Sequence, residues 1–343
     1  MPKLPDFIRG VYVDIADSTA CVIDDNNACV NSASQNYTPD LNYKFLSQFN
    51  VVWLTFLDYD MKVPPSFKQI KPKLTDTIVL YAIGGQAYSD KANIPPTWMT
   101  DENEGEQMAA NVLNNNNDYG SDYCDGIDLD LETPIMNKKL PGLLSFIRYI
   151  RSKKPQWIVT CAVMGSAGNY LYSKDGSEIY NIIAKTFPLS SNCTSENLID
   201  TIGLMQYQGV TSLDYVMDWS GNSVSHKSCV NVPSNRIIAG LGGQDVTQDY
   251  INKICDSKDV GGFMLWCFGA PNGPNYGGDL IKRQNYRQLN FNCKTSKDNG
   301  GNSSKDNGGN SSKDNGGNKF YVWFILFLLF FIVGILCILF LNL

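Results

Sequence analysis

An alternating row of acids in DGIDLDLE, from Asp125 to Glu132, has a spacing suited to proton transfer. If this segment is a β-strand, Asp128, Asp130 and Glu132 share one face, because successive side chains of a strand point to opposite faces. Carboxylates crowded inside a protein lose solvation and repel one another, so a purely structural row is unfavourable. The same crowding raises a carboxyl pKa, which lets Glu132 hold a proton at neutral pH and act as a general acid. Asp128 and Asp130 are expected to share a proton as a coupled pair.

Other chemistry fits the reactive residues less well. A calcium loop beginning at Asp128 needs glycine at its sixth position, where this chain has Thr133. The single histidine, His226, removes Ser-His and Cys-His nucleophile pairs, and the cysteines form no CxxC pair. We therefore expect carboxylates to transfer the protons, and we expect neither a metal nor a cofactor.

The elements that must position these acids are eight short, mostly apolar runs separated by helix-compatible stretches. The expected strands are Ile8–Asp14, Val51–Asp58, Thr77–Gly84, Gly126–Glu132, Trp157–Met164, Thr201–Tyr207, Arg236–Leu241 and Gly261–Phe268. Helical apolar spacing appears between them, at Leu140–Ser152 and Asp245–Cys255. Alternating strands and helices predict a parallel sheet, and eight such units predict an α/β protein with a (β/α)8 TIM barrel. Glu132 then lies at the carboxyl end of the fourth strand, where such barrels place reacting groups.

DGIDLDLE resembles the DGxDxDxE signature of glycoside hydrolase family 18, the chitinases and their relatives, at every signature position. Four weaker matches occur in the family's order: Tyr12 in IRGVYVD, Gly84 and Gly85 in AIGG, Met205 and Tyr207 in MQY, and Trp266 in GGFMLW. The resemblance extends from Ile8 to about Cys293. It implies a glycosidase, an enzyme that hydrolyses O-glycosyl bonds.

The resemblance also implies catalytic roles, in a retaining mechanism assisted by the substrate's own N-acetyl group. Glu132 would protonate the glycosidic oxygen and then activate water. Asp130 would accept a hydrogen bond from the acetamido N–H, and Asp128 would share its proton. Tyr207 would align the acetamido carbonyl, which is the nucleophile.

Trp266 would form the apolar floor under the sugar, and Tyr12, Met205, Gly84 and Gly85 are further candidates for substrate binding. Taken without the family pattern, Tyr207, Met205, Trp266 and Tyr12 fit a plain core role as well.

Two positions depart from the family pattern. Ala82 replaces a serine that usually supports the aspartates, and Gln208 replaces an acid found in many relatives. Too few residues separate Leu241 from Gly261 to hold the α+β insertion that walls the groove in many exo-acting relatives. We therefore expect an open groove and endo-type cleavage.

The leading hypothesis is an endo-acting chitinase that hydrolyses β-1,4 linkages between N-acetylglucosamine units. An endo-β-N-acetylglucosaminidase acting on N-glycans would use the same catalytic residues. A catalytically inactive chitin-binding lectin is the third hypothesis, although such relatives typically lose the acid that Glu132 retains. All three bind chitin or another glycan containing N-acetylglucosamine. The net charge of −6 argues against a nucleic-acid partner.

The chain is expected to have three parts: a catalytic barrel (1–293), a flexible linker (294–319) and a membrane anchor (320–343). The linker repeats SKDNGGNS, which has no apolar face to bury. The last part is free of charge and long enough to span a bilayer as one transmembrane helix. The first residues contain no run suited to a secretory signal. The side of the membrane stays open, and a virion or cell surface would both fit.

The cysteines offer one candidate disulfide near the start of the chain. Cys21 and Cys29 lie close together in a polar segment. Spacing alone does not decide connectivity, so ordinary thiols remain the alternative.

Overall fold

A computed structural model describes most of the first of two compact units, Met1–Thr295 and Ser296–Leu343. The described residues are 3–14, 21–23, 29–31, 43–85, 94–132, 134–165, 177–189, 194–205, 213–220, 230–242, 246–268 and 289–293. Tyr207, Gln208, the expected linker and the expected anchor lie outside these ranges. Among the described helices, none is long and apolar enough to cross a membrane.

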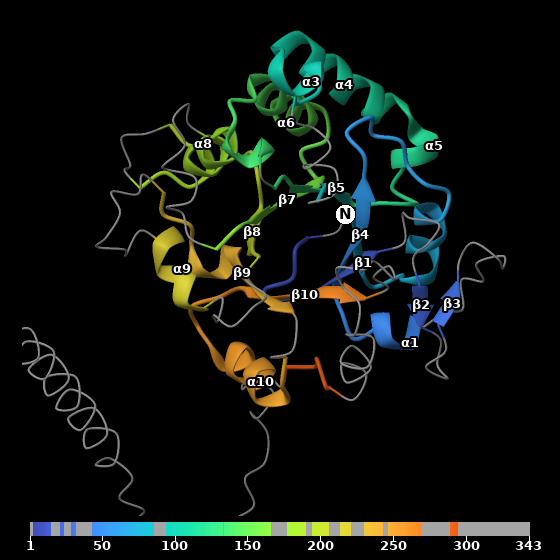
Figure 1. Cartoon of the computed structure of the whole chain (residues 1–343), viewed down its shortest axis with the longest axis vertical. Helices are drawn as coiled ribbons and strands as arrows, with labels where there is room; N and C mark the ends of the chain where they lie inside the picture. The colour runs from blue at the N-terminus through green and yellow to red at the C-terminus, as the bar shows by residue number, and fades with distance from the viewer. Residues whose placement is uncertain are drawn as a thin grey trace, which may run out of the picture. The chain divides into compact units, whose positions relative to one another are not determined.

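Eight parallel strands close into a barrel (Figure 1). In order around the barrel they are β1 (Ile8–Asp14), β10 (Gly262–Phe268), β9 (Ile237–Gly242), β8 (Thr201–Leu204), β7 (Ile158–Val163), β6 (Gly126–Asp130), β5 (Ile78–Gly84) and β4 (Val51–Leu57). Each predicted strand overlaps one of these, and β1 matches at both ends. The predicted TIM barrel is confirmed.

Helices surround the barrel in the described part of the chain (Figure 1). They are α1 (Tyr43–Leu46), α3 (Thr97–Thr100), α4 (Glu102–Asn114), α5 (Asn116–Tyr119), α6 (Pro141–Lys153), α8 (Glu178–Thr186), α9 (Leu213–Trp219) and α10 (Gln248–Asp256). Short 3₁₀ turns are η1 (Phe67–Gln69), η2 (Lys71–Lys73), η3 (Ile135–Asn137) and η4 (Ser234–Arg236), and β2 (Cys21–Ile23) pairs with β3 (Cys29–Asn31) as a separate ribbon. The helical spacing predicted at Leu140–Ser152 and Asp245–Cys255 corresponds to α6 and α10.

The buried side chains form two layers, one between barrel and helices and one inside the barrel. The inner layer includes Tyr12, Trp53 and Ala82. Gly10 of β1 makes room for the largest of these, because a Cβ at Gly10 would lie 2.0 Å from Trp53 Cζ3. The Trp53 indole can therefore extend across the barrel interior.

A repeated contact sets the strand register at the amino ends of the strands. Asp200, just before β8, accepts a hydrogen bond from the Val159 N–H of β7, and its own N–H donates to the Val159 carbonyl. Asp125 before β6 binds Val79 in the same way, and Asn50 before β4 binds Arg9. Each contact fixes a strand relative to its neighbour.

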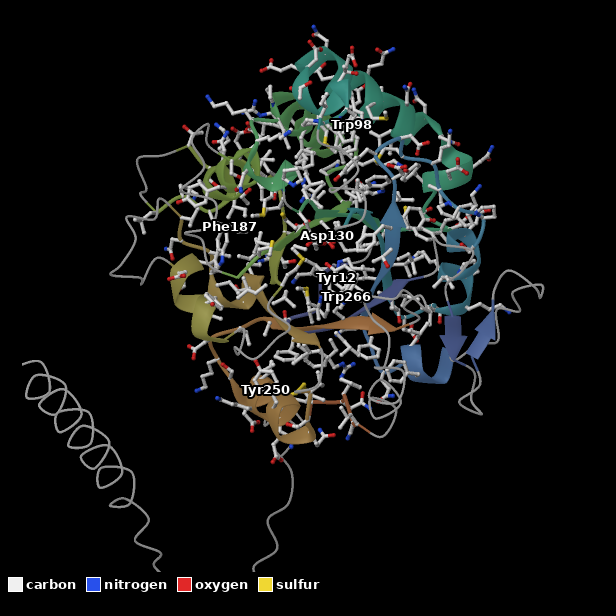
Figure 2. The ribbon with its side chains drawn as sticks, in the orientation of Figure 1. Tyr12, Trp98, Asp130, Phe187, Tyr250 and Trp266 are labelled. Atoms are coloured by element: carbon white, nitrogen blue, oxygen red, sulfur yellow. A yellow bond between two sulfur atoms is a disulfide. The ribbon has the colours of Figure 1, made fainter. Side chains whose placement is uncertain are left out.

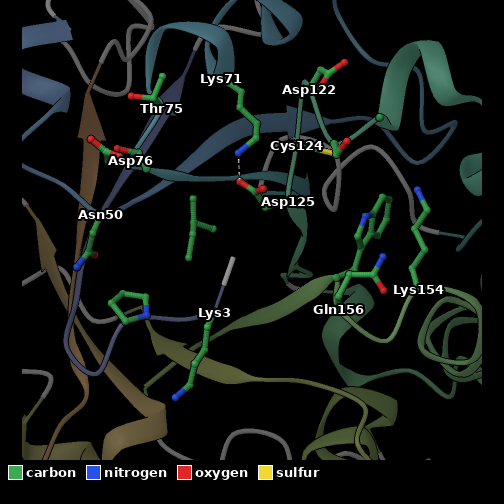
Figure 3. A pocket seen from close by; sticks show the side chains of 16 residues that line it. Lys3, Asn50, Lys71, Thr75, Asp76, Asp122, Cys124, Asp125, Lys154 and Gln156 are labelled. Carbon is green, nitrogen blue, oxygen red and sulfur yellow. Dashed lines mark hydrogen bonds and ion pairs between the residues drawn. The ribbon is translucent and has the colours of Figure 1, made fainter. Parts of the chain in front are cut away.

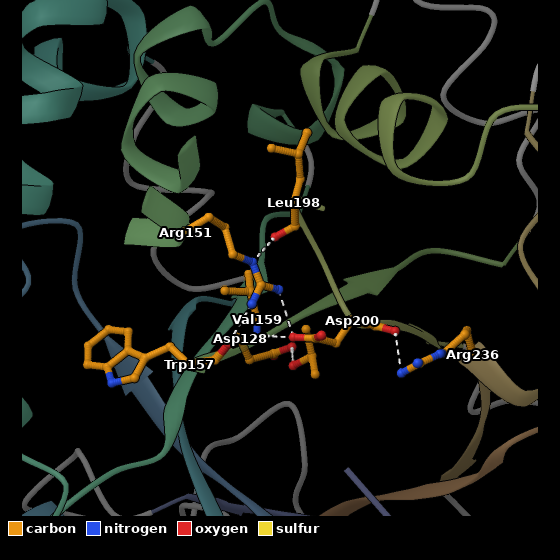
Figure 4. Close-up of polar contacts among 8 residues, drawn as sticks. Asp128, Arg151, Trp157, Val159, Leu198, Asp200 and Arg236 are labelled. Carbon is orange, nitrogen blue, oxygen red and sulfur yellow. Dashed lines mark hydrogen bonds and ion pairs between the residues drawn. The ribbon is translucent and has the colours of Figure 1, made fainter. Parts of the chain in front are cut away.

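Arg151 of α6 also contacts Asp200, with which it forms an ion pair, as Figure 4 shows. Its guanidinium donates to Asp200 Oδ2 at 2.7 Å and to the carbonyl oxygens of Leu198 and Trp157. The helix and the start of β7 are thereby held together.

The described disulfide joins Cys255, at the end of α10, to Cys293. Sequence spacing did not identify this pair, because its members are 38 positions apart. Cys21 lies opposite Asn31 in the β2–β3 ribbon, and the side chains of Cys21 and Cys29 lie outside the described structure.

Candidate active site

The row of acids lies at the carboxyl end of β6, but the strand is shorter than predicted. β6 ends at Asp130, so the expected strand position of Glu132 is wrong. Pro134 lacks an N–H for a strand ladder, and the Met136 N–H donates to the Glu132 carbonyl at 3.0 Å as the chain turns into η3. Asp128 and Asp130 are only 1% and 2% exposed, whereas Glu132 is half-buried. The two aspartates therefore lie inside the barrel and Glu132 lies at its rim.

Asp128 accepts a hydrogen bond on each carboxylate oxygen. The Tyr12 hydroxyl donates to Oδ2 at 2.9 Å, and the Thr160 hydroxyl donates to Oδ1 at 2.5 Å. Thr160 in turn accepts from Trp53 Nε1 at 3.0 Å. Burial raises the pKa of Asp128 to about 6, although both hydrogen bonds oppose that shift because they favour the charged form.

Asp130 differs from Asp128 in its hydrogen bonding. Its Oδ1 atom is buried and has no hydrogen-bond partner in the described part of the structure. Burial is the main cause that raises its pKa well above the ordinary range, and the charges of Glu132 and Asp128 raise it further. The three acids are therefore electrostatically linked, and burial favours the neutral form of Asp130.

The predicted glycines hold the backbone of Asp130 in place. Gly84 pairs with Asp130 across β5 and β6, and the Gly85 N–H donates to the Asp130 carbonyl at 2.7 Å. Gly84 has φ +105°, and a Cβ there would lie 2.4 Å from that carbonyl oxygen. The close approach of the two chain segments requires glycine at this position.

Aromatic rings lie beside the acids, as Figure 2 shows for Tyr12, Asp130 and Trp266. Trp266 of β10 packs edge-on against Tyr12 at 5.4 Å and stacks with Phe56 at 5.6 Å between ring centroids. Trp266 is half-buried, so part of its surface is open to solvent. Tyr12 is only 1% exposed, and its hydroxyl contacts Asp128.

Of the two remaining candidates from the sequence, Met205 lies in the described part of the structure and Tyr207 does not. Met205 directly follows β8, where its N–H donates to Val163 and its side chain packs against the inner layer. The side chain of Tyr207 lies outside the described residues, so its role stays a prediction.

Three residues at the site were missed by sequence reasoning: Trp53, Phe56 and Thr160. Trp53 and Phe56 occur in VVWLTFL, where aromatic residues are unremarkable in a buried strand. Thr160 offered a usable signal, because its hydroxyl lies in the otherwise apolar run WIVTCAV. In the described ranges, no group of three or more His, Cys, Asp or Glu side chains could hold a metal ion.

Comparison with known proteins agrees with this geometry. Residues 19–261 match the family described as "Glycosyl hydrolases family 18". The chain belongs to glycoside hydrolase family 18. A comparison with curated protein sequences finds no match.

Two solved structures, with TM-scores of at least 0.50, share the fold of this family 18 chain. A class V chitinase from Nicotiana tobaccum, a Glu-to-Gln mutant in complex with NAG4, is 11% identical with a TM-score of 0.51, covering 83% of this chain and 100% of its own. A second structure of class V chitinase from Nicotiana tobaccum is 11% identical with a TM-score of 0.50, covering 83% of this chain and 100% of its own. A chitinase-like agglutinin from Robinia pseudoacacia is 14% identical with a TM-score of 0.49, covering 80% of this chain and 99% of its own.

A separate cavity of about 1060 Å³ lies at the amino end of this family 18 barrel (Figure 3). Its lining includes Asn50, Asp125 and Trp157, which precede β4, β6 and β7. Lys71 forms an ion pair with Asp125 there, and the Lys154 ammonium lies 4.9 Å from the Trp157 ring centroid. TIM-barrel enzymes react at the carboxyl ends of their strands, so this cavity is not part of the candidate active site.

Proposed function

We propose that this family 18 barrel is an endo-acting chitinase, which hydrolyses β-1,4 linkages between N-acetylglucosamine units with retention of configuration. The observation that carries the proposal is the pair of buried aspartates next to the half-buried Glu132. Neither Asp128 nor Asp130 has a cationic partner among the described side chains. Burying carboxyl groups in this way is unfavourable for folding, so the arrangement favours a catalytic over a structural role.

The roles follow from where each acid lies. Glu132 at the rim can reach a glycosidic oxygen, donate its proton, and later take a proton from the attacking water. Asp130 would accept the acetamido N–H of the sugar, which positions the acetamido carbonyl for attack on the anomeric carbon. That attack forms a cyclic intermediate with a positive charge. The carboxylate of Asp130, next to the acetamido group, would stabilise this charge.

Trp266 and the loop after β9 support a polymer substrate. The partly open indole of Trp266 gives the sugar ring an apolar surface next to the acids. β9 ends at Gly242 and β10 begins at Gly262, and the interval between them contains α10. That connection leaves no room for a wall-forming domain, which favours a groove that accepts internal bonds of a chain.

The test compares the full chain in detergent with Glu132→Gln, using N-acetylglucosamine oligomers and colloidal chitin. Glu132→Gln keeps the side-chain shape but cannot donate the proton, so kcat should fall by about 10²–10⁴-fold. Glu196→Gln is the matched control, because Glu196 pairs with Arg148 on the surface, and it should retain activity. An internal cleavage pattern would support endo action.

Three other outcomes separate the alternatives. Release of sugars only from chain ends would contradict the endo proposal. Cleavage of N-glycans without chitin hydrolysis would favour the endo-β-N-acetylglucosaminidase. Chitin binding without any hydrolysis would overturn the enzyme proposal and favour a lectin.

We also propose that residues 320–343 anchor the barrel to a membrane through the linker 294–319. The support is the sequence itself, a charge-free run of sufficient length after a repeat with no apolar face. Deleting 320–343 should move the protein from the membrane pellet to the supernatant. Retention in the pellet would count against the anchor.

A further inference from the structure

The hydrogen bonds around Asp128 have directions that chemistry fixes. An indole Nε1–H can only donate, so Thr160 Oγ1 must accept from Trp53. The one hydroxyl proton of Thr160 is then free to point at Asp128 Oδ1, 2.5 Å away. Trp53, Thr160 and Asp128 therefore form a chain in which each donor points toward the carboxylate.

The strand register explains why the hydroxyl comes from β7. Asp128 lies between Ala82 of β5 and Thr160 of β7. Ala82 has no polar atom in its side chain, so Thr160 is the adjacent-strand residue able to donate to Asp128.

Trp53 supports both donors of Asp128 at once. Its ring stacks on the Tyr12 ring, with centroids 4.9 Å apart and planes 16° apart, while its Nε1 binds Thr160. All four side chains, those of Tyr12, Trp53, Asp128 and Thr160, are at most 2% exposed. Water therefore has little access to replace either donor.

We propose that Thr160, oriented by Trp53, is a positioning residue that keeps Asp128 fixed and charged, so that the proton shared by the two buried aspartates is carried by Asp130. The proposal rests on the function proposed above, because it assigns the starting protonation state of that reaction. Asp130 would begin the cycle neutral beside Glu132, and Asp128 would provide the negative charge that later accepts the proton.

The other groups around Asp128 are consistent with this assignment. Tyr12 from β1 and Cys161 from β7 are titratable, Asp130 lies on the same strand, and β5 contributes Ala82, which does not titrate. Burial raises the pKa of Cys161 well above its ordinary value, and the charges of Asp128 and Asp130 raise it further, so that thiol stays neutral. Both carboxylate oxygens of Asp128 accept a hydrogen bond, while the Oδ1 atom of Asp130 has no donor among the described residues.

The test replaces Thr160 with valine, which keeps the β-branched shape and removes the hydroxyl. Losing a donor to the charged form raises the pKa of Asp128, so the acidic limb of the kcat profile should move up by about one pH unit. At neutral pH, kcat should fall by about tenfold with little change in KM, because a catalytic group is less well oriented. Thr160→Ser should restore both values.

Matched variants separate positioning from a structural effect. Thr201→Val removes another buried hydroxyl, one paired in register with Thr160 but without a hydrogen bond in the described structure, and should leave the pH profile unchanged. Trp53→Phe keeps an aromatic ring against Tyr12 and removes the N–H, so it should shift the limb in the same direction by less. A change in Tm without a shift of the limb in Thr160→Val would overturn the proposal.

A second readout works without catalysis. The carboxyl pKa of Asp128 can be followed by 13C NMR of labelled aspartate in the full chain, with Asp128→Asn to assign the signal. An upward shift in Thr160→Val supports the proposal even if the wild-type chain hydrolyses no substrate, which would reject only the proposed function. A downward shift would mean that Asp128 holds the proton and donates it to Thr160, and would overturn the proposal.

Discussion

At the amino ends of the strands, Asp125 and Asp200 each form an ion pair with a basic side chain. Near the carboxyl ends, Asp128 and Asp130 form no ion pair with a basic side chain among the described residues. All four aspartates lie in or directly before a barrel strand. Their side chains nevertheless differ in their partners: basic side chains at the amino end, and neutral donors or none at the carboxyl end. The position of an acid along the barrel therefore says more about its role than its burial does.

The amino-end acids are satisfied in a way that stabilises the fold. Asp125 binds Lys71, and Asp200 binds Arg151. Each carboxylate also accepts a backbone N–H from the neighbouring strand. These contacts tie strands and helices together, which is what a structural acid is expected to do.

The carboxyl-end acids have only neutral donors or none. Asp128 accepts from two hydroxyl groups, and Asp130 Oδ1 has no partner in the described structure. Both carboxyl pKa values are raised, mainly by burial. Such acids destabilise the folded state when charged, and this cost is typical of groups retained for catalysis.

The largest expected contrast comes from Asp130→Asn. At the carboxyl end this change removes a catalytic carboxyl, so kcat should fall by about 10²–10⁴-fold. Stability should stay the same or increase, because no ion pair is lost and a buried ionisable group is removed. Kinetics with chitin oligomers and urea unfolding measure the two effects. If Asp130→Asn instead lowered the stability of the barrel and kept full activity per folded molecule, Asp130 would be a structural acid and not a catalytic one.

Much of this contrast was predictable from the sequence, and the reason differs between its parts. The strands and Asp128, Asp130 and Glu132 were found because apolar runs and period-two alternation are local signals. Thr160 was not found, since only the register of β6 and β7 places its hydroxyl at Asp128. The end of β6 was also misplaced, because the turn after Asp130 depends on a contact between Met136 and Glu132.

The structural acids at the amino end were harder to find for the same reason. Asp200 lies in the mostly apolar run LIDTIGL, and its partner Arg151 is 49 positions away. Sequence periodicity carries no information about which distant cation meets which acid. The pairing becomes visible only when the barrel has closed.

The pH dependence of stability should sharpen the comparison next. Asp128 has a folded pKa of about 6 against an ordinary 3.8, so the folded state keeps a proton that the unfolded state releases. Stability therefore falls as pH rises from about 4 to about 6, by about 3 kcal/mol for this group. Asp128→Asn should flatten that fall in urea unfolding at a series of pH values. Equal losses in the variant and the wild type would show that Asp128 does not cause it.

The smallest expected effect comes from Asp125→Asn at the amino end. Asn50 occupies the equivalent place before β4 and accepts the Arg9 N–H, so an amide oxygen can replace the carboxylate in the backbone contact. What is lost is the charge that faces Lys71, which is 18% exposed and lines the open amino-end cavity. Because Lys71 can turn toward water, the loss of stability should be about 1–2 kcal/mol. This is less than the loss expected when removal of one partner leaves a buried charge without an ion pair. The kcat per folded molecule should not change. A large loss of kcat with normal stability would mean that the amino end contributes to the reaction, and the division between structural and catalytic acids would fail.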